Sequence, residues 1–313
     1  MSTQSPYLNW YPLPDPTLDS HPKQQYSAAT IAAYSLGPVF IVLSHIGCGL
    51  ALITGLSLGA WLWAAFLYWI RMLAITGIYH RLLTHKAYST PAAVKWIGSI
   101  IASASGQMGP SWWKGHHSEH HIHSDHPRDP HASINGFWWS HYKWLLTTNF
   151  LPAKLPADIE KDPVLKAIDR FHFVPLIALA ALSYAIGGSE YLAAFFVSTT
   201  LLFHGVATVN SLCHKFGAQP FDSGDRSRNN LFVAIITLGE GWHSCHHAFP
   251  WSARQGITVT HNKVKYLPDF TWSFIQCLQA VGLASNLKLP PETDLVASAT
   301  KKLESFPTAQ PAK

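Results

Sequence analysis

The most restrictive feature of this sequence is a long stretch without formal charge. No Asp, Glu, Lys or Arg occurs from residue 24 to residue 70. A membrane-spanning helix needs about 20 apolar residues, so two such helices fit here with a turn near Gly55. A second uncharged region is divided only by Glu190, into residues 171–189 and 191–214. The sequence therefore predicts an all-α membrane protein with four transmembrane helices in two hairpins.

The distribution of Lys and Arg predicts the orientation of these helices. Ten Lys and Arg residues lie in 80–170 and ten in 215–313, whereas neither hairpin turn has one. Cytoplasmic loops carry the excess of positive charge, so both segments and both termini are expected in the cytoplasm. We therefore expect a multi-pass protein with its active site in a helical cytoplasmic cap. The expected organisation is a cytoplasmic N-terminal segment at 1–27, an integral membrane domain at 28–289 and a disordered tail at 290–313.

Two shorter features refine this expectation. Residues 92–110 are apolar but contain Ser, Gly and Gln, which favours an interfacial or re-entrant helix. Arg71 falls inside a predicted span, where a charge is costly unless it faces the helix bundle, so we expect a structural role for it. A soluble helical enzyme with two buried hairpins is the alternative architecture.

Histidine is unusually frequent, with 19 residues against 17 Asp and Glu together. Packing does not require this excess, which points to metal or proton chemistry. His117-Ser-Glu-His120-His121 and His243-Ser-Cys-His246-His247 repeat one pattern, with rings at i, i+3 and i+4. On a helix two of these rings share a face and the third flanks them, as chelation requires. The repetition indicates a metal site.

Two further pairs extend this set. His80 and His85 fall where the second apolar span ends, and Asn210 and His214 lie one helical turn apart at the end of the fourth. The total is too large for one tetrahedral zinc and suits two metal ions with open positions, although imidazole alone leaves iron, copper, nickel and zinc open. Glu119, Asp129 and Glu240 are candidate acceptors that would orient ligand rings. The candidate catalytic and metal-binding residues are His80, His85, His117, His120, His121, His214, His243, His246 and His247, with Asn210 as a further metal ligand.

Other classes of protein are disfavoured. The four cysteines include no CxxC pair, so neither a disulfide framework nor a thiolate zinc site is indicated. Lys and Arg form no basic run, which excludes nucleic acid as an expected partner. A histidine-rich metal transporter is an alternative, but its ligands would face a path at mid-bilayer. Here the histidine clusters lie in charged segments outside the predicted spans.

The motifs, taken in order, resemble the membrane fatty-acid desaturases, in particular the group of stearoyl-CoA desaturases and bacterial and cyanobacterial acyl-lipid delta-9 enzymes. The resemblance runs from about Ile70 to Leu289. Order and spacing together make it specific. The motifs that carry it are His80-Arg-Leu-Leu-Thr-His85, Gln107-Met-Gly-Pro-Ser-Trp-Trp113, the two histidine triplets, Asp129-Pro-His131, Gly136-Phe-Trp-Trp-Ser-His141, Asn210-Ser-Leu-Cys-His214, Gly239-Glu-Gly-Trp242 and Ala253-Arg-Gln-Gly256.

The resemblance implies a specific chemistry. It implies two iron ions held by the histidines above, with His214 binding directly and Asn210 through water. It also implies a reaction that uses dioxygen and two external electrons to place a cis double bond, at the delta-9 position, in a saturated acyl chain. Breaking an unactivated C–H bond is beyond side-chain acids and bases, so a metal must do it. The chain has no haem, flavin or nicotinamide motif, so a separate ferredoxin or cytochrome b5 is the expected donor.

The same resemblance bears on the substrate. Gln107, Trp112, Trp113 and Trp242 lie near the histidine motifs and are expected to line an apolar acyl tunnel, the alternative being Trp at a membrane interface. Gly115 and His116 stand where acyl-CoA enzymes carry an Arg-Asp pair, which favours an acyl chain on a membrane glycerolipid and leaves acyl-CoA open. Ala207 replaces a common aromatic residue, so the tunnel is expected to be wider or deeper.

A second function shares this chemistry. Related histidine-motif membrane enzymes hydroxylate alkyl chains or oxidise isoprenoids. A hydroxylase or oxygenase is therefore the alternative to a desaturase, and the reaction product distinguishes the two. Ser118 and the pair Ser244-Cys245 depart from the residues common in desaturase motifs, and these departures bear on the substrate.

Overall fold

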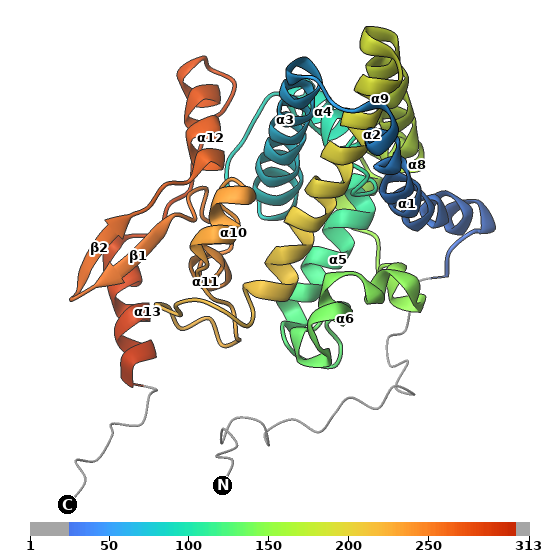
Figure 1. Ribbon diagram of the computed structural model, residues 1–313. Helices are drawn as coiled ribbons and strands as arrows, with labels where there is room; N and C mark the ends of the chain where they lie inside the picture. The colour runs from blue at the N-terminus through green and yellow to red at the C-terminus, as the bar shows by residue number, and fades with distance from the viewer. Residues whose placement is uncertain (1–24, 305–313) are drawn as a thin grey trace, which may run out of the picture.

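The computed structural model describes residues 25–304 and is mostly helical (Figure 1). The predicted N-terminal segment 1–27 lies almost wholly outside the described residues. The elements are α1 (Ala28–Gly47), α2 (Gly49–Thr54), α3 (Leu58–Leu73), η2 (Ala74–Thr84), α4 (Ala92–Ser103), α5 (Pro110–His123), η3 (Ser133–Asn135), α6 (Phe137–His141), η4 (Lys143–Leu146), η5 (Thr148–Phe150), α7 (Ala157–Glu160), α8 (Pro163–Arg170), α9 (Phe173–Leu212), α10 (Leu231–Ile236), α11 (His243–Ala248), β1 (Ile257–Thr260), β2 (Lys263–Tyr266), α12 (Phe270–Ala280) and α13 (Glu292–Glu304).

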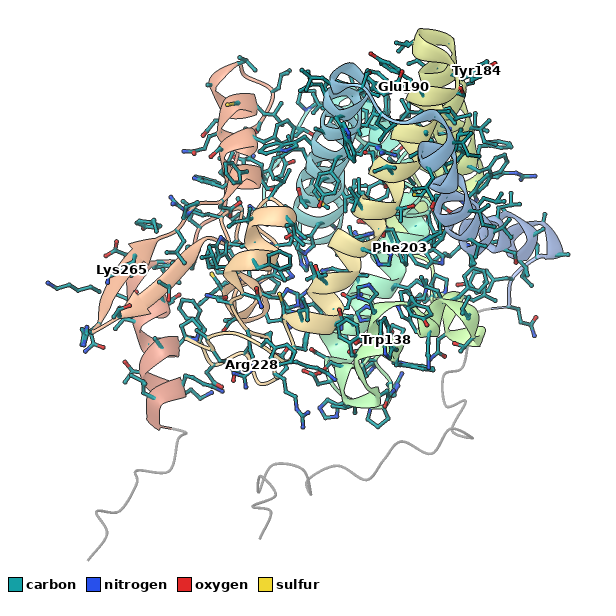
Figure 2. All side chains as sticks on the ribbon, viewed as in Figure 1. Trp138, Tyr184, Glu190, Phe203, Arg228 and Lys265 are labelled. Atoms are coloured by element: carbon teal, nitrogen blue, oxygen red, sulfur yellow. The ribbon has the colours of Figure 1, made fainter. Side chains whose placement is uncertain are left out.

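Three helical stretches are long and apolar enough to cross a membrane, namely Ala28–Thr54, Leu58–Thr84 and Phe173–Leu212. The third breaks at Gly187 and Gly188, where Gly188 has φ +63° and ψ −149°. Only glycine adopts this backbone conformation readily, so the sequence itself sets the break. The two arms of α9 meet at this kink near the top of Figure 1. Glu190, beside the kink, accepts a hydrogen bond from the backbone N–H of Ser57, which ties the kink to the turn before α3 (Figure 2).

Helix α9 is the centre of the packing, since it contacts α1, α2, α3, α4 and α6. The guanidinium of Arg71 is fully buried against it. Its Nη1 donates to the carbonyl oxygen of Ala104 at 3.0 Å and to Thr199 Oγ1 at 2.8 Å. Arg71 thus joins the end of α4 to α9, which is the structural role expected from the sequence.

The second spanning stretch ends in a π-helix rather than an α-helix. Helix η2 covers Ala74–Thr84, and its ladder continues to the backbone N–H of His85, which donates to the carbonyl oxygen of His80 at 3.1 Å. A π-helix joins residues i and i+5, so it places these two imidazoles on one face. Their ring centroids lie 4.8 Å apart. A spacing of five residues does not align two side chains on an α-helix. On this π-helix the same spacing brings the two imidazoles together.

Two features of the C-terminal part differ from what the sequence predicted. β1 and β2 form an antiparallel hairpin, joined by His261 and Asn262, which both have positive φ. Two such residues make the tight turn that matches strand twist, and the β-branched sequence of β1 favours a strand. The expectation of disorder after Leu289 is also wrong for residues 292–304, which form α13. Leu295 and Ala299 of α13 are buried in one apolar cluster with Phe221 and Phe249, and this burial stabilises the helix.

Candidate dinuclear metal centre

The nine histidines selected from the sequence meet in two adjacent groups. Within each group the candidate ligand nitrogens all lie within 4.8 Å of one another. We call the groups site A and site B. Site A consists of His80, His85, His117, His121 and His246, and site B of His120, His214, His243 and His247.

The repeated triplets divide their rings between the two sites. On α5, His117 and His121 are one turn apart and belong to site A, whereas His120 on the adjacent face belongs to site B. Helix α11 reverses this division, since His243 and His247 belong to site B and His246 to site A. Each helix therefore contributes to both sites, which explains why three histidines per triplet are needed.

The protonation of the rings in site B shows that the group fits a metal ion. Asp129 Oδ2 lies 2.9 Å from His120 Nδ1, and Asp225 Oδ2 lies 2.5 Å from His247 Nδ1. A carboxylate accepts a hydrogen bond, so in each neutral ring the proton is on Nδ1 and Nε2 has a lone pair. The two Nε2 atoms are 3.3 Å apart. Two lone pairs at that distance repel each other unless a cation lies between them.

Site A has the same convergence of nitrogen atoms. His80 Nε2 and His246 Nε2 are 3.0 Å apart, and His121 Nε2 lies 2.8 Å from His246 Nε2. Imidazole nitrogens bind transition metals at about 2.0–2.1 Å, and two such bonds at a right angle separate the nitrogens by about 3 Å. The donor set is therefore chemically and geometrically suited to a pair of transition-metal ions.

Buried carboxylates accept from the outward nitrogen of four of these rings, and the side-chain amide of Gln255 contacts that of a fifth. Glu240 contacts His80 Nδ1 at 2.5 Å, as Asp129 contacts His120, and both acceptors were expected from the sequence. Glu119 was also expected, but it pairs instead with His123 and Arg128, because its side chain points away from both sites on α5. The remaining partners were missed. Asp125 is 2.9 Å from His214 Nδ1, Asp225 contacts His247, and the amide nitrogen of Gln255, a donor, lies 3.1 Å from His246 Nδ1.

Burial keeps six of the nine rings neutral, whereas for His120 the charge of Asp129 outweighs burial and raises the pKa. Burial is the main cause that lowers the pKa of His243 and His246 well below 6.5, and it lowers the pKa of His247 to about 4. Neutral imidazole is the form that binds metals. For Asp129, burial alone would raise the pKa, but the adjacent His120 and His131 hold it well below its usual value. Asp129 is therefore charged, whereas His243, His246 and His247 are neutral.

A buried arginine supports the acceptor of site A. Arg81, next to His80 on η2, is completely buried and pairs with Glu240 at 3.2 Å and with Asp269 at 3.0 Å. Gly239 has φ +131°, and a Cβ there would lie 2.5 Å from Asp269 Oδ1 and 3.0 Å from Arg81 Nη2. The absence of a side chain at Gly239 therefore allows the arginine and both carboxylates to approach one another.

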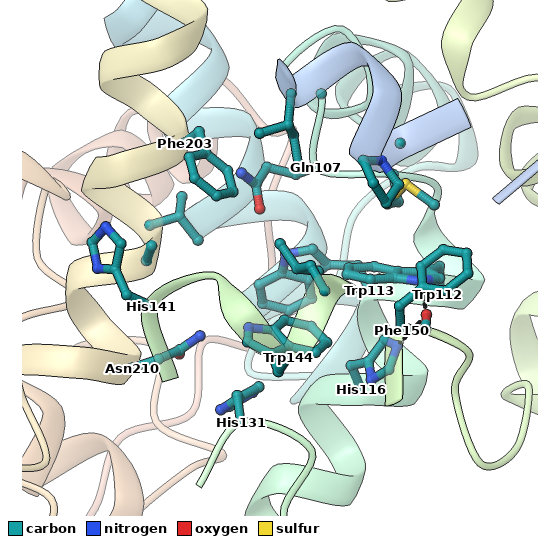
Figure 3. Close-up of a pocket in the computed structure, with 18 of the residues that line it drawn as sticks. Gln107, Trp112, Trp113, His116, His131, His141, Trp144, Phe150, Phe203 and Asn210 are labelled. Atoms are coloured by element: carbon teal, nitrogen blue, oxygen red, sulfur yellow. Dashed lines mark hydrogen bonds between the residues drawn. The ribbon is translucent and has the colours of Figure 1, made fainter. Parts of the chain in front are cut away.

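An apolar pocket of about 80 Å³ adjoins the histidines. Gln107, Trp112 and Trp113 line it, as expected, together with Asn210 and His117 (Figure 3). Trp242 does not belong to this lining. Its indole N–H donates instead to the carbonyl oxygen of Pro268 at 2.7 Å. Three of the four expected tunnel residues thus meet around one cavity, and the fourth is bound to the loop before α12.

Comparison with known proteins decides the family. The sequence model of the fatty acid desaturases matches residues 55–265. The chain belongs to the fatty acid desaturase family. An sn-1 stearoyl-lipid 9-desaturase of Anabaena variabilis is 39% identical over 80% of this chain and 92% of its own length. A chloroplastic palmitoyl-monogalactosyldiacylglycerol delta-7 desaturase of Arabidopsis thaliana is 36% identical over 71% of this chain and 60% of its own length.

A third relative is named for an acyl chain that is linked to CoA rather than to a lipid. An icosanoyl-CoA 5-desaturase of Limnanthes douglasii is 36% identical over 71% of this chain and 62% of its own length. These three relatives thus include desaturases named for lipid-linked and for CoA-linked acyl chains, at several double-bond positions. The family drawn from the histidine motifs is confirmed, and as a member of it this desaturase is an oxidoreductase of lipid metabolism.

Proposed function

We propose that this desaturase introduces a cis double bond into a saturated acyl chain at the delta-9 position, with dioxygen as oxidant and two electrons from a separate donor protein. The observation that carries the proposal is the convergence of nine imidazoles beside an apolar pocket. The proposed ligands of two iron ions are the site A and site B histidines, with Asn210 near both. Asn210 lines the pocket and also a second cavity bordered by His120 and His243.

The proposed topology has four membrane spans, with the two arms of α9 counted separately on either side of Gly188. The turn near Gly55 and the kink of α9 lie on the far side of the membrane, and both termini and the metal centre lie in the cytoplasm. The integral membrane domain is proposed to cover residues 28–289. Support comes from the apolar helices and from the concentration of Lys and Arg in the segments between them.

In this proposal the protein side chains position the reactants. When bound, the metal ions supply the chemistry that no side chain provides, which is dioxygen activation and hydrogen removal from an unactivated carbon. The stacked indoles of Trp112 and Trp144, with centroids 5.8 Å apart, form one apolar wall that holds the acyl chain and excludes water. Trp113 stacks on His117 at 4.8 Å, so the wall reaches a proposed metal ligand directly.

We propose a glycerolipid-bound acyl chain as the substrate. A Cβ on Gly115 would lie 3.0 Å from both the Lys154 carbonyl oxygen and Pro152 Cβ. A larger residue therefore cannot be accommodated here without a shift, and the position offers no cation for a CoA phosphate. The Anabaena relative, which is named as a stearoyl-lipid desaturase, supports this assignment. Acyl-CoA is the competing carrier, given the Limnanthes relative.

The test is a fatty-acid profile from a host without desaturases that produces this protein with a ferredoxin or a cytochrome b5. We expect a new cis-monoene in one glycerolipid class before it appears in acyl-CoA, and the position of its double bond tests delta-9. His120→Ala and His246→Ala should abolish it while membrane insertion persists, and His261→Asn, in the hairpin turn, should not. Full activity in both alanine variants would refute the metal assignment.

A hydroxylated acyl chain or an oxidised isoprenoid in the same profile would move the protein to the alternative oxygenase function. The aromatic lining of the pocket suits any long alkyl chain, so the product and not the pocket distinguishes these outcomes. Absence of any product with either donor, with wild type and His120→Ala behaving alike, would refute both enzymatic functions.

A further inference from the structure

Helix α10 exposes an apolar surface that the reaction centre does not use. Leu231, Phe232 and Ile235 are each more than half exposed, and their i, i+3 and i+4 spacing places them on one side of the helix. Phe270, the first residue of α12, is also exposed. We call these four residues the α10 face. No charged residue occurs from residue 229 to residue 239, and an uncharged apolar patch of this kind marks an interaction surface.

Two contacts fix the depth of the α10 face relative to the second spanning stretch, Leu58–Thr84. The Tyr68 hydroxyl donates to the carbonyl oxygen of Ile236, the last residue of α10, at 2.6 Å. The ring of Trp69 lies edge-on to that of Phe270, with centroids 5.5 Å apart. At 1.5 Å per residue, both contacts lie about 15 Å from the first residue of the stretch, near the middle of a hydrocarbon core of about 30 Å. In the proposed topology, the end of α10 and the start of α12 therefore lie below the membrane surface.

The backbone at the end of α10 is bonded in the way that a lipid environment requires. The last carbonyl oxygens of a helix have no partner within the helix, and at a water-exposed surface water supplies one. Here the carbonyl oxygen of Ile236 accepts from Tyr68. The carbonyl oxygen of Leu238 accepts from both the backbone N–H and the hydroxyl of Thr271, each at 2.9 Å. Protein groups thus take the place of water, which hydrocarbon cannot supply.

Helix α10 is also attached to the loop that leads into site B. The backbone N–H of Asn230, the N-cap of α10, donates to the carbonyl oxygen of Gly241 at 2.7 Å, two residues before His243. A Cβ on Gly241 would lie 2.0 Å from the backbone nitrogen of Ala234, so the helix and the loop are in direct contact. Thr237, which follows α10, lines the second cavity beside His243. The depth of α10 therefore sets the depth of the histidine triplet of α11.

We infer that the α10 face is inserted among the lipid acyl chains of the cytoplasmic leaflet, and that this insertion holds the histidine triplet of α11 at the depth of those chains. This inference rests on the topology given under the proposed function. Acyl chains are the occupant, rather than head groups or another protein, because the face carries no charge and continues the exposed, lipid-facing side of α3 at Trp69.

Insertion at this depth suits a lipid-bound substrate. The second cavity is bounded by Met72 and Ile75 of the spanning stretch and by Thr237 next to α10. A glycerolipid keeps its acyl chains in the leaflet, so such a chain is already at the level of this cavity. Acyl-CoA would have to bring its chain there from water.

The experiment is photolabelling of the wild-type desaturase in phosphatidylcholine nanodiscs that contain a lipid with a diazirine on its acyl chain. Peptide mass spectrometry locates the carbene adducts. Phe232 and the reference residue Leu62 of α3 are both 62% exposed, and we expect similar adduct yields on the two. Leu303 on α13 is 69% exposed and is the matched control. Its yield should be at least about 10-fold lower, because only an inserted face reaches the acyl region.

A second readout is the melting temperature of Phe232→Asp in the same nanodiscs. A charge among acyl chains is costly, so this variant should melt at least about 5 °C below the wild type. Leu303→Asp makes the same change on a surface that faces water and should leave the melting temperature unchanged. Equal shifts in the two variants would contradict insertion of the α10 face. If Phe232→Asp does not fold, the photolabelling of the wild type decides the matter.

The inference and the proposals on which it rests fail in different ways. Adducts on Leu62 without adducts on the α10 face would overturn the inference and retain the topology. A water-soluble carbene reagent would then show whether water or another protein covers the face. Absence of adducts on Leu62 would refute the topology itself. Labelling of the α10 face without any alkene in the fatty-acid profile would retain the inserted surface and refute the desaturase reaction.

Discussion

Glu240 joins the first and third histidine motifs, since its carboxylate contacts His80 Nδ1 at 2.5 Å through Oε2 and Arg81 through Oε1. His80 and Arg81, which are neighbours on η2, thus contact different oxygens of the same buried carboxylate. The charge of Arg81 keeps the carboxylate ionised, and the carboxylate fixes the proton of His80 on Nδ1. The lone pair of His80 Nε2 is thereby directed into site A.

Glu240→Gln is expected to lower the metal affinity of site A by about 10- to 100-fold, the usual effect of losing a partner of a ligand ring. Site B should keep its ion, because its rings depend on Asp125, Asp129 and Asp225. The measurement is metal content after dialysis against graded chelator. Glu119→Gln is the matched control and should leave both sites unchanged, since Glu119 contacts neither. Equal losses in the two variants would remove Glu240 from this role.

Part of this centre was predictable and part was not. The i, i+3 and i+4 spacing of His117, His120 and His121 is local information, because a helix converts it directly into geometry. The acceptors of His214 and His247 are not local. Asp125 lies 89 residues before His214, and the loop that brings them together carries no periodic pattern. Sequence spacing therefore identified all nine rings but only two of the five groups that orient them.

The fold likewise has features that the sequence predicted and features that it did not. Absence of charge identified the apolar stretches, because hydrophobic length is a property of short segments. The packing of Leu295 against Phe221 is a tertiary contact, so the polar composition after Leu289 predicted disorder where α13 forms. The π-helix was missed as well, since no residue preference marks it.

Asp169 should make stability depend on pH. Asp169 belongs to α8, and its buried carboxylate lies against the start of α5. It accepts hydrogen bonds from the Tyr34 hydroxyl and from the backbone N–H of Ser111. Burial raises its pKa to about 6. The native state then binds a proton more tightly than the unfolded state. The resulting contribution to the free energy of unfolding is fully present below about pH 4 and is lost as pH rises through about 6. The free energy of unfolding changes by about 3 kcal/mol across this range.

The check is thermal unfolding of wild type and Asp169→Asn in nanodiscs at pH 4 and pH 7. The free energy of unfolding of the wild type relative to the variant should fall between these values of pH. Asp222→Asn, at an ion pair on the surface, is the control and should follow the wild type. A difference that rises with pH would show that Asp169 is ionised in the folded protein throughout this range.

Gly188→Ala should destabilise the protein by about 1–3 kcal/mol through backbone strain alone. A Cβ at Gly188 would meet no atom within 4 Å, so steric contact contributes nothing. Gly49→Ala is the matched control, since it also meets open space but lies in a helix. The melting temperature of Gly49→Ala should not fall. Equal melting temperatures for the two variants would contradict the assigned conformation of the α9 kink.

Ala207→Phe should shift the products toward shorter acyl chains or abolish them. Ala207 lines the pocket on α9, and a phenyl ring there occupies much of a cavity of about 80 Å³. The chain-length distribution of monoenes in the expression host measures the effect. Leu201→Phe, on the exposed face of the same helix, should leave the distribution unchanged. An unaltered distribution in Ala207→Phe would place the acyl chain elsewhere.

The division of each triplet between the two sites has a consequence for how the protein is made. Site A needs His80 and His246, and site B needs His120 and His247, so both draw on distant parts of the chain. Neither site can close until residue 247 has left the ribosome, long after α3 and η2 have been synthesised. The nascent chain therefore carries its first five imidazoles without the complete ligand sets through most of translation, and completion of both sites is a late step that follows synthesis of residue 247.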